Sequence, residues 1–355
     1  MKKLAPIAAA VLACAAAHAQ TSSVTVFGLL DVSLARFTGD GPSVTGVMTD
    51  GYQSSRLGFR GVEDLGGGLS ASFWLEAALS PDTGSGGTTN KNNQPITAAT
   101  VNDAGLTFGR RSTVSLASEK AGELRLGRDY TPGFWNLSTF HPFGTNGVGS
   151  AGILFYPVQS GARITNVRAS NSVGYFLPKN LGGFYGQAMY AYGENSSTSA
   201  SPDDGKVIGA RLGYAAGPLD IAVGHTTTKA AAIHDFTQRN IGASYDLKVV
   251  KLFALYGRNE VGSTKTKPWN VGVHVPFGAG VFRAAYGKVK TEGVANDASQ
   301  WTLGYVHNLS KRTALYTNFS HIDNKRTGTT FNVGSSVTTP GGQSKGYELG
   351  IRHTF

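Results

Sequence analysis

The sequence contains one cysteine and three methionines, and after residue 20 no apolar stretch is long enough to span a membrane as a helix. A single cysteine, Cys14, cannot form an intrachain disulfide, so the chain is not a small domain held together by cystines. No proline-rich or serine-rich linker divides the 355 residues. These absences leave one very large domain or two smaller ones, and any crossing of a membrane would use strands.

The first residues have the order of a secretory signal peptide. Two lysines precede an apolar run that starts at Leu4, and Ala-His-Ala at 17–19 supplies small residues at a cleavage position. We therefore expect residues 1–19 to be removed and residues 20–355 to form the mature domain. An alternative interpretation is a lipoprotein processing site at Val-Leu-Ala-Cys (11–14), although its leucine fits that pattern poorly.

Glycine and aromatic residues are plentiful, with 48 Gly, 18 Phe and 14 Tyr, and the formal net charge is +10. This composition favours β structure, and the charge suits anionic partners. From residue 24 onward the segments alternate with a period of two: in 69–79, for example, Leu, Ala and Phe alternate with Ser and Glu. Such alternation predicts strands with one apolar and one polar face.

The predicted connections alternate in length. Short turns are expected at 63–68, 118–122, 178–183, 215–218, 246–249, 276–280 and 309–313. Longer links are expected at 38–51, 81–105, 129–166, 193–205, 226–237, 259–268, 290–298 and 322–346. These connections predict sixteen strands. An even number of strands with tight turns at one end and long loops at the other is typical of an outer-membrane barrel.

Aromatic residues recur near the predicted strand ends and would form the two interfacial girdles of such a barrel. They are Phe59, Phe73, Trp74, Phe108, Tyr175, Tyr190, Tyr192, Tyr214, Trp269, Tyr286 and Trp301. In a soluble sandwich the same residues would be core. That alternative needs two or three sandwiches, and the linkers between them are missing.

Several stretches together resemble the trimeric general porins of Gram-negative outer membranes, in particular the anion-preferring branch. They are SSVTVFGLLD (22–31), SSRLGFRGVEDLGGGLSASFWLE (54–76), GRRSTVSL (109–116), GELRLGRDYTP (122–132), TLGYVHNLSKRTALY (302–316) and GIRHTF (350–355). The resemblance implies an all-β, sixteen-stranded antiparallel barrel in a homotrimer. It also implies that the third long loop, 129–166, folds into the lumen as a constriction.

The resemblance further implies the partners of the chain. Outer-membrane lipid and lipopolysaccharide would surround it, and small anionic solutes would pass through it. The terminal Phe355, with apolar residues at alternate positions before it, resembles the signal that the barrel assembly machinery recognises.

Strand parity predicts which charged residues line the pore. Arg56 and Arg60 share the lumen face of the second strand, and Arg168 lies on the lumen face of the sixth. Glu76 points inward from the third strand and is the expected counter-charge, as in the family. A wide pore selects through its fixed charges, and arginine stays charged at any relevant pH.

The adjacent pair Arg110 and Arg111 leaves two alternatives. Strict alternation turns Arg111 inward. The alignment to the family favours Arg110 as the pore residue, which would require a β-bulge.

The third long loop departs from the family pattern, in which carboxylates face the arginines. Asp129, at its beginning, is the only acid between 129 and 166, and His141 stands where related anion porins can carry an acid. We expect this loss to favour anions. Alternatively, His141 only shapes a turn with the proline that follows it.

The predicted function is a general diffusion porin with anion preference; the alternatives are a channel specific for an anion such as phosphate or organic acids, a barrel enzyme, or an adhesin. The histidines are scattered and none has a nucleophile setting, so no catalysis is expected. No paired His or Cys spacing predicts a metal or other cofactor. The SPDDG loop (201–205) could bind a divalent ion, although a plain polar loop explains it. Arginines that alternate along strands do not suggest nucleic-acid binding.

Overall fold

Burial alternates from one residue to the next along most strands, because successive side chains point to opposite faces of the wall. A computed structural model describes residues 23–95, 105–156 and 165–355. The predicted signal peptide, 1–19, and the alternative processing site lie outside these residues. The described chain forms an 18-stranded sheet, of which β2 (Val44–Thr49) and β5 (Ser85–Gly86) are short.

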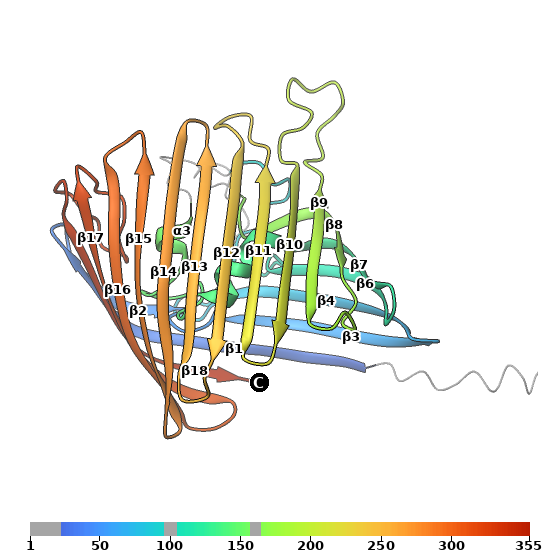
Figure 1. Cartoon of the computed structure of the whole chain (residues 1–355), viewed down its shortest axis with the longest axis horizontal. Coiled ribbons are helices and arrows are strands. Elements are labelled where there is room, and N and C mark those ends of the chain that lie inside the picture. Colours follow the sequence, from blue (N-terminus) through green and yellow to red (C-terminus); the bar gives the residue numbers. More distant parts are fainter. Residues whose placement is uncertain (1–22, 96–104, 157–164) are drawn as a thin grey trace, which may run out of the picture.

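The remaining strands form the barrel wall (Figure 1). They are β1 (Ser23–Gly39), β3 (Arg56–Gly66), β4 (Leu69–Ser80), β6 (Arg111–Ser118), β7 (Gly122–Tyr130), β8 (Arg168–Phe176), β9 (Phe184–Ala191), β10 (Val207–Ala216), β11 (Leu219–Thr228), β12 (Phe236–Asp246), β13 (Lys251–Val261), β14 (Thr264–Phe277), β15 (Gly280–Glu292), β16 (Asn296–Asn308), β17 (Thr313–Arg326) and β18 (Gln343–Thr354).

The barrel closes between its first and last strands. The antiparallel register of β1 and β18 runs from Leu29 opposite Thr354 to Gly39 opposite Ser344. Every other neighbouring pair in the wall is also antiparallel, so the prediction of a closed, sixteen-stranded antiparallel barrel is confirmed.

The wall carries its apolar side chains outward. Val24, Val26 and Leu34 of β1 are exposed, whereas Asp31 and Ser33 of the same strand are buried. This is the reverse of a soluble domain and suits a wall that faces lipid. Three of the predicted girdle residues, Trp269, Tyr286 and Trp301, lie close together on the outer face of β14 to β16. The girdle prediction is wrong for Trp74, which points inward and donates to Glu76.

Two of the predicted long links are wrong. The predicted link 259–268 is a hairpin in which β13 ends at Val261 and β14 begins at Thr264. The predicted link 290–298 is also short, since only residues 293–295 separate β15 from β16. The outward-facing Lys265 and Lys267, with Pro268, give the segment 259–268 the composition of a loop. Pro268 lies inside β14, and the pairing of β14 with β13 skips Lys267 and Pro268, because proline has no N–H to donate.

The second wall strand is interrupted at residues 50–55. β2 pairs with the end of β1 and β3 pairs with its beginning. Between them the chain turns inward and is held by Asp31, whose Oδ2 accepts the N–H groups of Tyr52 and Gln53 at 2.9 and 2.6 Å. The other carboxylate oxygen of Asp31 accepts the hydroxyl of Tyr316 at 2.5 Å. This interruption places the inward turn immediately before Arg56.

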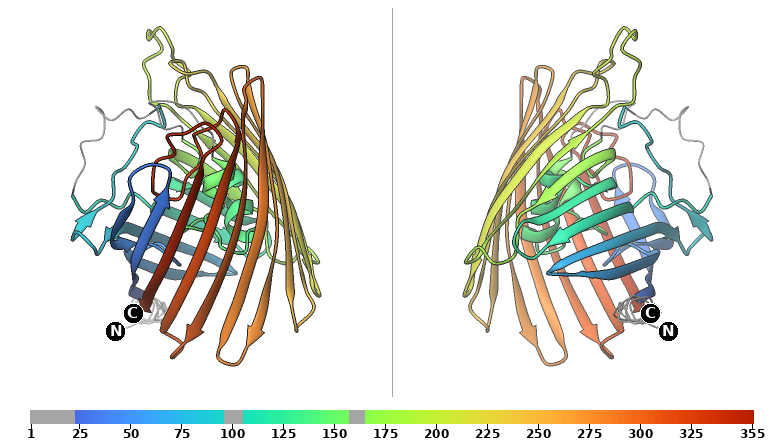
Figure 2. Two further views of the ribbon diagram at one scale, coloured as in Figure 1. Left: turned by 90° about the vertical axis from the view of Figure 1, so that its left-hand side faces the viewer. Right: turned by 90° about the vertical axis from the view of Figure 1, so that its right-hand side faces the viewer.

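The described part of the link between β7 and β8 lies inside the barrel and holds two short helices, α2 (Pro132–Phe140) and α3 (Gly152–Phe155) (Figure 2). Phe140 packs where a side chain at Gly242 of β12 would stand, since a Cβ there would lie 2.3 Å from its ring. Asn136 donates to Asn240 Oδ1 at 2.8 Å, and Gln300 donates to the Val148 carbonyl at 3.1 Å. Neither helix, nor any other that the structure describes, is both long and apolar enough to cross a membrane.

Candidate functional site

Glu76 of β4 is the centre of the predicted arginine cluster. Its side chain is buried, and its Oε1 lies 2.6 Å from Arg110 Nε and 3.5 Å from Arg56 Nη1. Its Oε2 accepts the indole N–H of Trp74 at 3.0 Å. Parity predicted that Arg56 and Glu76 would share the inner face, and the structure brings both to one cavity.

Arg110 and Arg111 both reach this cavity, so the structure contains both alternatives that the sequence left open. β6 begins at Arg111, and its recorded register with β4 starts where Arg111 stands opposite Glu76. Arg111 therefore points inward by alternation. Arg110 precedes the strand, so alternation does not fix its direction and no bulge is needed.

Tyr130, at the end of β7, joins the cluster and was not predicted. Its hydroxyl accepts hydrogen bonds from Arg110 Nη2 at 2.9 Å and from Arg168 Nη2 at 3.2 Å. The Arg168 guanidinium also lies 4.6 Å from the centre of the Tyr130 ring. Its position directly after Asp129 was visible in the sequence, but nothing there showed that two arginines from other strands would meet it.

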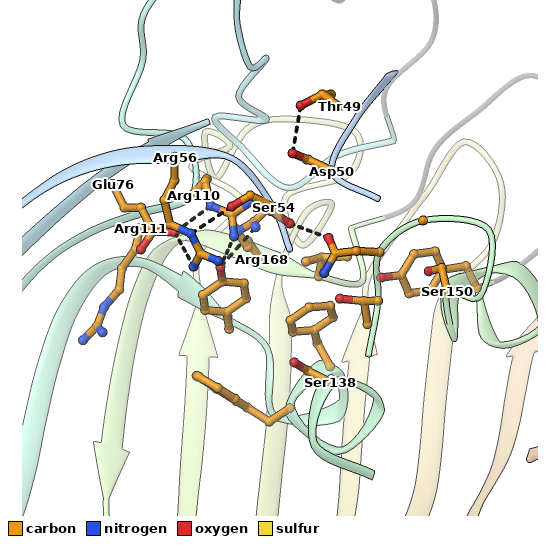
Figure 3. A pocket seen from close by; sticks show the side chains of 18 of the residues that line it. Thr49, Asp50, Ser54, Arg56, Glu76, Arg110, Arg111, Ser138, Ser150 and Arg168 are labelled. Atoms are coloured by element: carbon orange, nitrogen blue, oxygen red, sulfur yellow. Dashed lines mark hydrogen bonds and ion pairs between the residues drawn. The ribbon is translucent and has the colours of Figure 1, made fainter. Parts of the chain in front are cut away.

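The cavity has a volume of about 660 Å³ and lies between the barrel wall and the internal loop (Figure 3). The wall contributes Arg56, Trp74, Glu76, Arg110, Arg111, Tyr130 and Arg168, the end of β2 adds Thr49, and the inward turn adds Asp50 and Ser54. The loop contributes Phe134, Trp135, Ser138, Thr145, Asn146, Gly147, Ser150, Tyr156 and Val167. Ser54 donates to Asn146 Oδ1 at 2.6 Å and so links the two sides.

The lining is positively charged. Four arginines face only two carboxylates, those of Asp50 and Glu76, and residues 130–166 contain no Asp or Glu. In water, two unit charges about 4 Å apart repel by only about 1 kcal/mol, so several guanidinium groups can stand together in a solvated lumen.

Three predicted site residues do not line the cavity. Arg60 lies nearer the β3–β4 turn, 5.3 Å from the rings of Phe27 and Trp74. Asp129 is buried and paired with Arg125, with Oδ2 2.5 Å from Nη1, and its Oδ1 lies 3.6 Å from Arg111 Nε. It is therefore a counter-charge behind the cluster.

His141 is the third of these residues and is buried beyond the end of α2. Its Nδ1 accepts the N–H of Phe143 at 3.2 Å. Burial, reinforced by Arg283 and His274, lowers the pKa of His141 to about 3, so the ring is neutral at neutral pH. The hydrogen bond fits the turn-shaping alternative.

A closed barrel with an apolar exterior, a polar interior and a charged internal cavity defines a membrane channel. Residues 7–327 match the family model described as Gram-negative porin, and the chain belongs to that family. The chain is 38% identical to outer membrane porin protein 32 of Delftia acidovorans, over 98% of this chain and 99% of that protein. It is thus an outer-membrane porin, and the predicted porin family and outer-membrane location are confirmed.

Solved structures agree on the fold. The anion-selective porin from Comamonas acidovorans superposes with a TM-score of 0.81 at 35% identity, covering 94% of this chain and 100% of that one. The trimer form of OmpT from Vibrio cholerae superposes with a TM-score of 0.65 over 94% of this chain and 99% of that one. At 15% identity, OmpT supports the fold alone.

Proposed function

We propose that this porin is a general diffusion channel that prefers small anions, and that Arg56, Arg110, Arg111 and Arg168 set this preference. The observation that carries the proposal is the convergence of these four guanidinium groups on one cavity with only two carboxylates. The solved relative described as anion-selective supports it. Asp129 and Glu76 hold the arginines in place, and Arg60 extends the positive surface toward the short-turn end.

The reversal potential of the purified protein in a planar bilayer, across a KCl gradient, tests this function. We expect stepwise conductance increases and a reversal potential whose sign shows chloride preference. A bilayer that stays closed, or a cation preference, would contradict the proposal.

A homotrimer is part of the proposal, as is export with loss of residues 1–19. The exposed apolar outer wall, which can pack against a neighbouring barrel as well as against lipid, supports association. Conductance steps in multiples of three would test it. Recognition of Phe355 by the barrel assembly machinery is also proposed. Phe355 exchanges backbone hydrogen bonds with Gly28 at 3.1 and 3.2 Å, so the terminal residue completes the seam between β1 and β18.

Lipopolysaccharide is the proposed lipid partner. On the outer face, Lys267 of β14 stands directly opposite Lys290 of β15, and Lys288 stands opposite Trp269. Like charges directly opposite each other on a sheet are destabilising. Lys267 is compensated by its ion pair with Glu292, whereas Lys288 and Lys290 form no ion pair within the described residues, so these two are the proposed phosphate ligands. The three lysines adjoin the outer aromatic residues on the side of the β13–β14 hairpin, where lipid phosphates would meet a barrel.

A further inference from the structure

The wall of the cavity that faces the arginines is aromatic. Tyr130 and Phe134 stack with ring centres 5.2 Å apart and planes 10° apart, and Trp135 meets the edge of Tyr130 at 5.3 Å. Tyr156 completes this group of cavity-lining rings. Three of the four rings belong to the internal loop, which places no carboxylate opposite the arginines.

The cationic and aromatic surfaces of the cavity are continuous. The Arg168 guanidinium lies over Tyr130, and the Arg111 guanidinium lies 4.7 Å from the centre of the Trp74 ring. A solute held by one surface therefore touches the other. A small inorganic anion would use only the arginines.

Two buried donors at the cavity find no acceptor among the described residues: the indole N–H of Trp135 and the Nε–H of Arg168. A buried donor without an acceptor costs about 1–3 kcal/mol, so each of these groups would gain from an acceptor oxygen once its side chain turned toward the cavity. One donor belongs to the aromatic wall and the other to the arginine cluster.

We propose that the cavity is a binding site for aromatic carboxylates, which this channel admits in preference to aliphatic anions of the same charge. The carboxylate accepts hydrogen bonds from the guanidinium groups, which match its planar geometry. The ring packs against Trp135, Phe134 and Tyr130 in stacked or edge-to-face contact. This inference rests on the proposed anion path and names its solute class.

Block of chloride current in a planar bilayer tests the inference, with benzoate, cyclohexanecarboxylate and acetate as matched probes. Benzoate and cyclohexanecarboxylate share charge and approximate size but differ in aromaticity. We expect benzoate to reach half-block at a concentration about two- to ten-fold lower than cyclohexanecarboxylate, because aromatic pairs add that much to apolar burial. Acetate should block least.

Variants assign the effect to the loop. W135L should remove the advantage of benzoate, while W135F should retain most of it. W269L, which changes a ring on the outer face, is the matched control and should change neither.

Equal block by benzoate and cyclohexanecarboxylate in the unmodified protein would overturn the inference while leaving chloride preference intact. Absence of chloride preference in the unmodified protein would instead overturn the proposed function. The probe series needs no variant, so the test stands even if W135L fails to assemble. A benzoate advantage that W135L and the double variant F134L/W135L both preserve would place the binding elsewhere and would also overturn the inference.

Discussion

Arg110 Nε lies 2.6 Å from Glu76 Oε1, and this ion pair joins the segment before β6 to the inner face of β4. Both side chains are almost fully buried, at 10% and 4% exposure, although they belong to the lining of a channel. Glu76 thus has two roles: it orients Arg110, and it cancels part of the positive charge that the cavity presents.

Replacing Glu76 with glutamine separates these two roles. E76Q should increase chloride preference, because one negative charge leaves the cavity. It should also lower the free energy of unfolding by about 1–3 kcal/mol, because Arg110 loses a charged acceptor. Reversal potentials report the first effect and heat denaturation in detergent the second. E63Q, at the exposed end of β3, is the control; chloride preference that stays unchanged in E76Q would argue against Glu76 as a cavity charge.

Neutralising the cavity arginines should weaken anion preference without unfolding the barrel. We expect R56Q and R168Q each to shift the reversal potential toward zero, and the double variant to shift it further. R239Q, on the outer face of β12, should leave it unchanged. Barrels that no longer fold would instead assign Arg56 and Arg168 a structural role.

The internal loop is tied to the wall through a carboxylate. Glu348 of β18 accepts the N–H of Val148 at 3.2 Å and the side-chain amide of Asn318 at 3.1 Å. E348A should free this part of the loop and increase current noise and spontaneous closures in single-channel records. E348Q keeps an oxygen that can accept the Val148 N–H and should behave more like the unmodified protein. Quiet records from E348A would show that the helices hold the loop unaided.

Acid should destabilise the loop through His141. Its pKa is about 3 in the barrel against 6.5 for an ordinary histidine. As the pH falls, the unfolded chain therefore takes up a proton on this histidine before the folded protein does. Its contribution to stability is complete above pH 6.5 and is lost as the pH falls toward 3, by up to about 1.4 kcal/mol per pH unit. The difference in melting temperature between pH 7 and pH 4.5 should be smaller in H141Q than in the unmodified protein. An equal difference in both proteins would assign the acid sensitivity to other groups.

The inward direction of Arg56 and Glu76 is predictable from the sequence, because a period of two fixes the face of every residue inside a strand. The direction of Arg110 is not predictable in this way, because that residue lies just outside β6, where alternation ends. The same rule wrongly predicts a long loop at 259–268, because lysines on the outer face beyond the lipid give these strand residues the composition of a loop. Strand identity was therefore predictable, and strand ends were less so.

The aromatic wall of the cavity was not predictable in the same way. α2 is a nine-residue helix inside a long link, and contacts with wall strands distant in sequence, such as Asn136 to Asn240, hold it in place. Short helices gain most of their stability from such packing, so local sequence carries little signal for them. Trp135 becomes a cavity residue only through this tertiary placement.

The outer lysines should bind the phosphates of lipopolysaccharide. Lys267 pairs with Glu292, but Lys288 and Lys290 form no ion pair within the described residues. K288Q/K290Q should therefore reduce the amount of lipopolysaccharide that remains bound after purification in mild detergent, which native mass spectrometry can count. K179Q/K311Q, in two short turns at the opposite end, removes the same charge and should not reduce it. Equal retention by all three proteins would show that bound lipid does not depend on these lysines.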